Sequence, residues 1–401
     1  MSLKTHTTPN TIVERLSHSA RDKAPVAGFT HNFYRYPARF SPVFASTAIE
    51  LFSRPGDLIL DPYMGGGTTI IEAIVAGRRA VGADLNSLAV FISRVKTTRL
   101  KITEQEEVLA WISKHVKTFS YVHKREVLEK VLNDKRTKNM TLVRARFIKK
   151  IIAASIISLE SIESSRAKDF ARCAILKTGQ WALDGRKTHT QLSEFRSKLV
   201  ENIHQMLTEM RVFGKRIIKR SPGFPRCKLI ETNAALINKA PIFAKRGLKV
   251  DLVVTSPPYP GLHILYHRWQ VDGRRETPAP YWIAGCQDGQ GDSYYNFGSR
   301  QEANLNSYFE SSLRTLKSIR SVMQPRGYMV QMLAFKNPTI QLPRYLENME
   351  EAGFREVSYC DSDQSNLNGR IWRTVPNRKW HAIQKGETPG SREVVLIHRA
   401  I

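Results

Sequence analysis

The chain has 401 residues, 41% of them hydrophobic, and 62 Lys and Arg against 36 Asp and Glu give it a formal net charge of +26. It contains no run near 18 apolar residues and no apolar signal core at its start, which excludes a membrane span and favours a cytoplasmic protein of one enlarged domain or two. So large a positive excess opposes compaction unless a polyanion neutralises it, and nucleic acid is therefore the expected partner rather than a membrane.

Two features exclude other classes of site. The four cysteines lie far apart and form no CxxC pair: Cys173, Cys227, Cys286 and Cys360. Neither a zinc site nor a disulfide framework is indicated, and we expect no metal.

The N-terminal half begins with a polar stretch, residues 1–28, which we expect to be flexible. An alternating pattern follows from Pro55 to Lys96: PGDLILDP predicts a strand, GGGTTIIEAIVAG a helix, RRAVGADLN a second strand and SLAVFISRVKT a second helix. Such a β-α-β-α unit predicts a right-handed parallel sheet.

Helical periodicity then replaces the sheet pattern over residues 101–225. Between residues 100 and 226 there are 27 Lys and Arg against 13 Asp and Glu. We predict a basic helical insertion there, and the alternative is a solvated decoration of the core.

The sheet pattern returns from residue 226 onward. RCKLIETNAA, DLVVTSPPY, GYMVQMLAF, REVSYC and REVVLIHRA predict strands, while LNSYFESSLRTLKSIRSVM and LPRYLENMEEAGF predict helices. Two long irregular stretches remain, residues 260–300 and 361–391, and loops of that length usually serve function or are disordered.

Residues with ligand-binding character follow three of these strands. Asp61 precedes a glycine run, which lets a backbone approach a ligand closely, and then a helix N-terminus with free N–H groups. Asp84 ends the second strand, where an acidic residue can accept hydrogen bonds from ribose hydroxyls or cap the next helix. A nucleoside cofactor is expected, although the spacing is neither G-x-G-x-x-G nor that of a phosphate-binding loop.

The tetrapeptide Ser256-Pro-Pro-Tyr259 ends the strand DLVVT. Paired prolines fix φ and lack N–H groups, so the corner is stiff and presents carbonyl acceptors beside a hydroxyl and a flat ring. These groups suit an exocyclic base amine beneath a stacked ring, and the alternative is a turn without a catalytic role.

Together, YPARFSP, DPYMGGGTT and SPPY resemble motifs X, I and IV of the amino-group DNA methyltransferases, over roughly residues 30–100 and 226–400. The resemblance implies a Rossmann-like class I methyltransferase fold of the α/β class, with a mostly parallel sheet, an antiparallel last strand and a large helical insertion. It divides the chain into a flexible segment 1–28, a catalytic domain 29–100 plus 226–401, and a DNA-binding insertion 101–225.

The resemblance also assigns residues to S-adenosylmethionine and to catalysis. The residues implied to hold the cofactor are Pro37, Arg39, Phe40, Asp61, Pro62, Tyr63, Gly65, Gly66, Gly67, Thr68, Thr69, Asp84 and Asn233. Asn233 departs from the acidic residue usual near the adenine amine. The implied catalytic residues are Ser256, Pro257, Pro258 and Tyr259.

The implied reaction is direct displacement of the sulfonium methyl by a flipped-out base amine, without a cysteine nucleophile. SPPY favours cytosine N4 in double-stranded DNA, and a cognate restriction endonuclease is a possible partner. The alternatives are adenine N6, an RNA guanine-N2 enzyme, or a non-catalytic nucleic-acid-binding protein on the same scaffold.

Basic and aromatic residues complete the expected site. For contact with nucleic acid we single out Lys149, Lys150, Lys215, Arg216, Lys219, Arg220, Tyr266, Arg268, Arg274 and Arg275. The aromatic residues of the loop after SPPY have an alternative role as that loop's own small core.

Overall fold

A mostly parallel sheet forms the centre of the protein in this computed structural model. The structure describes residues 9–37, 40–119, 133–186, 188–220, 227–245, 247–260, 268–272, 275–288, 297, 305–357, 370–374 and 392–401. The strands lie side by side in the order β3 (Cys227–Glu231), β2 (Arg79–Asp84), β1 (Leu58–Asp61), β4 (Val250–Thr255), β7 (Met323–Leu333), β10 (Arg392–Ala400) and β8 (Phe354–Glu356), and β9 (Ile371–Thr374) also pairs with β10.

Neighbouring strands are parallel from β3 to β7, whereas β10 runs antiparallel to β7, β8 and β9. The predicted Rossmann-like α/β fold with an antiparallel last strand is therefore confirmed.

Alternating residues of the strands feed two hydrophobic cores, one on each face of the sheet. In β1, Leu58 and Leu60 enter one core while Ile59 enters the other, as the two-residue period of a strand requires. The helices of the first face are η5 (Ala234–Lys239), α10 (Pro241–Ala244), α13 (Asn306–Val322) and α14 (Pro338–Glu351). Those of the second face are α1 (Pro9–Arg21), α2 (Pro42–Phe52), α3 (Thr68–Val75) and part of α4 (Ser87–Thr97).

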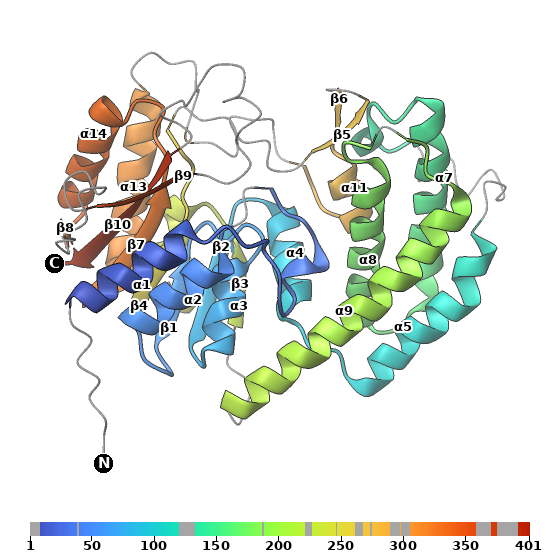
Figure 1. Cartoon of the computed structure of the whole chain (residues 1–401), viewed down its shortest axis with the longest axis horizontal. Helices are drawn as coiled ribbons and strands as arrows, with labels where there is room; N and C mark the ends of the chain where they lie inside the picture. The colour runs from blue at the N-terminus through green and yellow to red at the C-terminus, as the bar shows by residue number, and fades with distance from the viewer. Residues whose placement is uncertain are drawn as a thin grey trace.

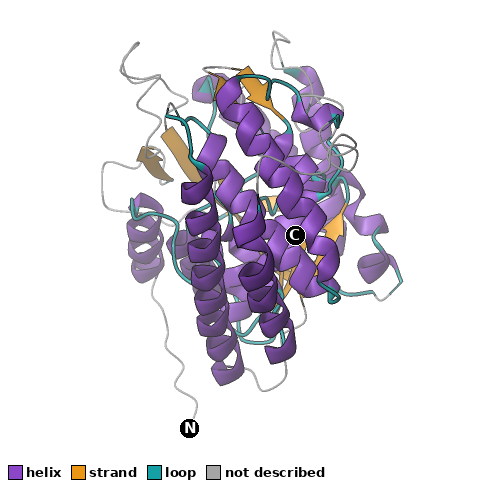
Figure 2. Cartoon of the chain, turned by 90° about the vertical axis from the view of Figure 1, so that its right-hand side faces the viewer, coloured by secondary structure: helices purple, strands orange, loops and turns teal. Residues whose placement is uncertain are grey.

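The predicted helical insertion forms a second body of the molecule, to the right in Figure 1. Its elements are α5 (Ile102–His115), η2 (Val116–Thr118), η3 (Lys135–Thr137), α7 (Val143–Ser158), η4 (Leu159–Ser161), α8 (Ser165–Leu183) and α9 (Leu192–Arg220). Figure 2 faces this body and shows its long helices side by side. A third core fills it and continues into α4 and the short helix η1 (His31–Phe33), so the insertion is packed onto the sheet.

One ordered segment lies where the sequence showed only an irregular stretch. The hairpin β5 (Trp269–Asp272) and β6 (Arg275–Thr277) and the helix α11 (Ala279–Ala284) follow the SPPY corner but belong to the core of the helical body. Trp269 is 1% exposed, and its indole N–H donates to the Tyr34 hydroxyl at 3.0 Å. The aromatic residues of this stretch that the structure describes thus have a packing role.

The N-terminal segment also differs from its predicted flexibility. Pro9–Arg21 forms α1, and Leu16 and Ala20 are buried in the core shared with α2. The stretch is polar on average, but its few apolar residues are spaced along one helical face. Among the described residues, no helix is long and apolar enough to cross a membrane.

Candidate active site

The predicted site residues gather at the carboxyl edge of the sheet, where β1, β2 and β4 end side by side. Leu60 pairs with Val253 of β4 and Asp61 with Gly82 of β2, so the three following loops leave from one edge. Ligands of open α/β sheets bind at this edge.

The glycine loop between β1 and α3 has a backbone that other residues cannot adopt easily. Gly65 and Gly67 have φ of 45° and 76°, in the left-handed region. A Cβ on Gly67 would lie 2.6 Å from Ser93 Oγ, and one on Gly66 would lie 3.1 Å from Tyr36 Cβ. The glycines therefore allow Tyr36 and α4 to close onto the loop.

Residues of α4 fix the loop through its carbonyl groups. Ser93 Oγ donates to the Gly65 carbonyl at 3.1 Å, and Lys96 Nζ donates to the Gly66 carbonyl at 2.9 Å. Lys96 is only 1% exposed. A buried ammonium group needs such acceptors, and here they hold the loop in one conformation.

Two buried carboxyl groups flank the glycine loop. Asp61 accepts from Thr255 Oγ1 at 2.7 Å and from the Tyr63 N–H at 3.1 Å, and burial raises its pKa to about 6. Asp84 accepts from the Gly65 N–H at 2.9 Å and the Asn86 N–H at 2.8 Å, and burial likewise raises its pKa to about 6. Desolvation disfavours the charged form more than these hydrogen bonds favour it.

The other residues expected around the cofactor have the following places. Thr68 and Thr69 are buried at the start of α3, and Thr69 Oγ1 donates to the Val254 carbonyl at 3.3 Å. Burial raises the pKa of Tyr63 well above its usual value. The Pro62 side chain is buried between Asp61 and Tyr63.

The YPARFSP segment lies against the glycine loop through Tyr36, whose hydroxyl accepts from Asn86 Nδ2 at 3.1 Å. Pro37 is half-buried, and the half-buried ring of Phe40 packs edge-on against Phe44. Arg39 lies outside the described residues. Sequence reasoning missed Tyr36, although it begins the quoted motif.

Asn233 lies beside Asp84, because the Thr232 N–H donates to the Asp84 carbonyl at 3.0 Å. Its Oδ1 accepts from the Ala235 N–H at 2.9 Å and so caps η5. The acidic residue at this point is Glu231, which pairs with Asp84 in register and is exposed.

The SPPY corner is held by hydrogen bonds from two other parts of the chain. Ser256 Oγ lies 2.9 Å from the Tyr259 hydroxyl, which donates to Glu393 Oε1 of β10 at 2.8 Å. The Tyr308 hydroxyl donates to the Pro258 carbonyl at 2.8 Å, and Pro257 is buried. The corner is therefore tied to the same sheet that carries the glycine loop.

The residues singled out for nucleic acid do not share one surface. Lys149 is half-buried near Asp134, and desolvation lowers its pKa. Arg268 pairs with Asp288 at 3.0 Å. Lys150 is half-buried, whereas Arg275, Lys215 and Arg216 are exposed. Tyr266 and Arg274 lie outside the described residues, as do the side chains of Lys219 and Arg220.

Lys215 and Arg216 lie at the wrong edge of the sheet to join the site. The last residues of α9 lead into Cys227, the first residue of β3, which pairs with Ala80 near the start of β2. Figure 1 shows this end of α9 at the bottom, at the amino edge of the sheet.

No thiolate or metal chemistry is visible in the described part of the chain. Burial raises the pKa of Cys173 and Cys227 to about 12 and that of Cys286 to about 11, so these thiols stay protonated near neutral pH. The same residues contain no group of three or more His, Cys, Asp or Glu side chains that could hold a metal ion.

Comparison with known proteins points in one direction. Residues 14–94 match a family model described as "DNA methylase" for N6 and N4 methyltransferases. The chain is 25% identical over 276 residues to the type II methyltransferase M.MvaI of Kocuria varians, which covers 62% of this chain and 59% of that protein.

Two further proteins show some similarity. The chain is 38% identical over 74 residues to the tRNA (guanine(10)-N2)-dimethyltransferase of Methanothermobacter thermautotrophicus, covering 18% of this chain and 22% of that enzyme. An rRNA methyltransferase structure from Streptomyces viridochromogenes aligns with 11% identity over 99% of this chain and 96% of that chain, at a TM-score of 0.35.

The family match covers the glycine loop, Asp61 and Asp84, and the M.MvaI similarity extends over more than half of the chain. The chain belongs to the amino-group DNA methyltransferase family.

Proposed function

We propose that this protein methylates the exocyclic amine of a base in DNA, with cytosine N4 as the target atom. The observation that carries the proposal is the union of the two motifs at one edge of the sheet. Thr255, which directly precedes SPPY, donates to Asp61 Oδ1 at 2.7 Å, directly before the glycine loop. A base amine at Ser256 would therefore face a cofactor held by that loop.

Membership in the family implies S-adenosylmethionine as the cofactor. The residues present fit it, because the loop presents its backbone where a side chain would clash, and Asp84 has the place expected for a ribose partner. The glycine loop and Asp61 would hold the methionine half. When bound, the cofactor supplies an electrophilic methyl group.

The role of the chain itself is then mainly positioning. Ser256 Oγ and the Pro257 carbonyl would accept from the two N–H groups of the amine, and so aim its lone pair. Tyr259 would offer its ring to the flipped base. Because the described thiols are protonated, this mechanism needs no covalent base adduct.

Cytosine is favoured over adenine because the corner begins with serine, the residue favoured among cytosine-N4 enzymes of this family. Adenine N6 is the nearest alternative. The similarity to a tRNA guanine-N2 enzyme favours RNA as a third candidate. Modified-base sequencing of DNA from cells that express the protein tests these together, because it reports base, position and strand. DNA without added methyl groups would contradict the proposal, and a methylated RNA would replace it.

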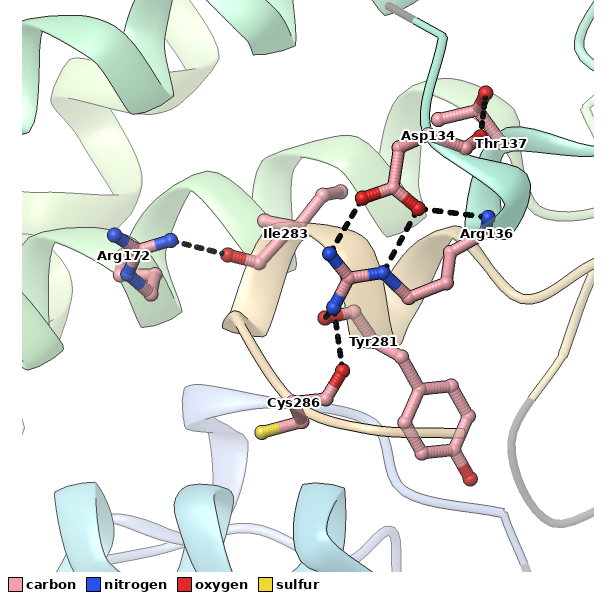
Figure 3. A network of polar contacts seen from close by, with 7 residues as sticks. All are labelled: Asp134, Arg136, Thr137, Arg172, Tyr281, Ile283 and Cys286. Carbon is pink, nitrogen blue, oxygen red and sulfur yellow. Dashed lines mark hydrogen bonds and ion pairs between the residues drawn. The ribbon is translucent and has the colours of Figure 1, made fainter. Parts of the chain in front are cut away.

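We further propose that DNA lies over the carboxyl edge and the adjoining end of the helical body. There, Arg136 pairs with Asp134 and donates to the Cys286 carbonyl at 2.6 Å, and Arg172 donates to the Ile283 carbonyl at 3.0 Å (Figure 3). Ser87, at the start of α4, donates to the next carbonyl, that of Gln287, at 2.8 Å. This network fastens α11 both to the helical body and to the catalytic edge.

Lys135 and Lys138, which flank Arg136, are exposed beside this network, and they provide a test. Changing both to Gln is expected to weaken DNA binding and to flatten its salt dependence by about 0.9 per lost phosphate contact. Lys215→Gln with Arg216→Gln is the matched control, because it removes the same charge at the opposite edge. Equal effects of the two pairs, measured by titration at several salt concentrations, would show that location does not matter.

The raised carboxyl pKa values predict how cofactor affinity depends on pH. Asp84 becomes protonated as the pH falls through about 6 and then no longer accepts from a hydroxyl group. Calorimetry should therefore show a loss of affinity of about tenfold from pH 7 to pH 5, since about one tenth of a group with that pKa is ionised at pH 5.

Asp84→Asn should weaken binding at pH 7 and flatten the profile, whereas Asp57→Asn, at the amino end of β1, should leave both unchanged. A wild-type profile in Asp84→Asn would remove Asp84 from the cofactor site. In the free protein the same pKa shift acts in the opposite sense. The folded state holds these protons more tightly than the unfolded state, so their stabilising effect is lost as the pH rises through about 6.

A further inference from the structure

A hydrogen-bonded chain leads from the catalytic serine to a carboxylate on the last strand. Ser256 Oγ and the Tyr259 hydroxyl are 2.9 Å apart, and that hydroxyl lies 2.8 Å from Glu393 Oε1. Glu393 is 4% exposed although it is charged. A carboxylate buried among apolar residues of a strand needs an explanation.

An arginine on the neighbouring strand holds this carboxylate in place. Arg373 stands opposite Glu393 in the β9–β10 ladder, and its Nε and Nη2 lie 2.7 Å and 2.5 Å from Glu393 Oε2. Its Nη1 also donates to the Ala20 carbonyl at the end of α1, at 3.1 Å. Both ends of the ion pair are therefore anchored, and Glu393 Oε1 is aimed at Tyr259.

The carboxylate sets the direction of the whole chain. A carboxylate only accepts hydrogen bonds, and a phenol has a single proton, so Tyr259 gives that proton to Glu393. The Tyr259 oxygen then acts as an acceptor towards Ser256, and the serine proton points to Tyr259. The remaining lone pairs of Ser256 Oγ are left to accept a hydrogen bond from a ligand.

We propose that Glu393 is a positioning residue that makes Ser256 a hydrogen-bond acceptor for the target amine. This inference rests on the proposed function. If the chain ran the other way, the Ser256 hydroxyl would be free to donate to the amine nitrogen and would occupy the lone pair that must attack the methyl group. Glu393 thus acts on the reaction through two other side chains.

The test compares binding rather than turnover. Two duplexes are used, identical except that the methylated base, once mapped, carries hydrogen in place of its exocyclic amine in one of them. The affinity of each is measured with S-adenosylhomocysteine present, so no reaction occurs. The wild-type protein should prefer the amine by about tenfold, as expected for one oriented hydrogen bond, and Ser256→Ala should lose this preference.

Two variants test the inference itself. Tyr259→Phe keeps the ring but breaks the chain, and Glu393→Gln lets an amide donate to Tyr259 and reverse it. Each should reduce the preference by about fivefold to tenfold, and the double variant should lose no more than either single variant. Glu356→Gln is the matched control, because it breaks the similar ion pair with Arg370 on β8, which does not reach Tyr259.

The outcomes separate this inference from the proposed function. A wild-type preference in folded Tyr259→Phe and Glu393→Gln would overturn the role of Glu393 while leaving the methyltransferase proposal intact. An equal loss in Glu356→Gln would also overturn it, because the effect would then come from general weakening of the sheet. Absence of any preference in the wild-type protein, together with unmethylated DNA, would contradict the proposed function instead.

Discussion

Replacing Ser256 by alanine is expected to lower the rate of methyl transfer by about 10- to 1000-fold, the usual effect of losing one oriented hydrogen bond in a transition state. The substitution leaves Pro257, Pro258 and the ring of Tyr259 in place. Since Ser256 contacts neither the glycine loop nor the basic end of the helical body, the affinities for cofactor and DNA should change little.

Single-turnover kinetics with labelled cofactor, alongside calorimetry and DNA titration, measure these quantities separately. Ser46→Ala, on the exposed side of α2, makes the same chemical change away from the edge and should behave as wild type. Tyr259→Ala should weaken the complex with DNA as well as the rate, because stacking of a base on an aromatic ring is worth about 1–3 kcal/mol. Wild-type turnover in Ser256→Ala would refute its catalytic role.

Replacing Gly67 by alanine is expected to destabilise the protein by about 2–4 kcal/mol and to weaken cofactor binding at least about tenfold. Part of the cost is conformational, because Gly67 has a φ of 76°. The rest is steric, because the new Cβ would meet Ser93 Oγ at 2.6 Å. Ser93 also fixes the Gly65 carbonyl, and the Gly65 N–H donates to Asp84, so a displaced Ser93 would disturb the cofactor side of the loop.

Gly56→Ala separates the two contributions. Gly56 has a φ of 91°, and a Cβ there would meet nothing within 4 Å. It should cost only the conformational part, about 1–2 kcal/mol, with unchanged cofactor affinity. Urea unfolding and calorimetry on both variants measure the difference. If the two substitutions have the same effect, the loop does not depend on its contact with Ser93.

Local patterns were sufficient to predict the sheet and the helices around it. The apolar run at Leu58–Asp61, the glycines after it and the second strand at Arg79–Asp84 are each encoded by neighbouring residues. The hairpin β5–β6 and helix α11 were not predictable in this way. Their stability depends on burying Trp269 among helices that are distant in sequence, and no period in the sequence reports such a contact.

The site shows the same division. Asp61, Asp84 and the SPPY corner follow strands directly, so the rule that ligands bind at the carboxyl edge was sufficient to find them. Lys96 and Glu393 were missed because their roles depend on tertiary contacts. Glu393 is separated from Tyr259 by 134 residues, and the only local signal was a charge at the start of an otherwise apolar strand. A charged residue in a buried element was the clue to read.

The place of β10 in the sheet also determines when the active corner can assemble. β10 lies between β7 and β8, yet residues 392–400 follow every other described strand along the chain. The Arg373 side chain reaches Ala20, a partner 353 positions away. Contacts of such long range close late in folding, because the loop entropy must be lost before they contribute. A partly synthesised chain can therefore form the glycine loop and display Ser256 without fixing the direction of its hydroxyl group, so competence for catalysis would arise only at the final step of folding.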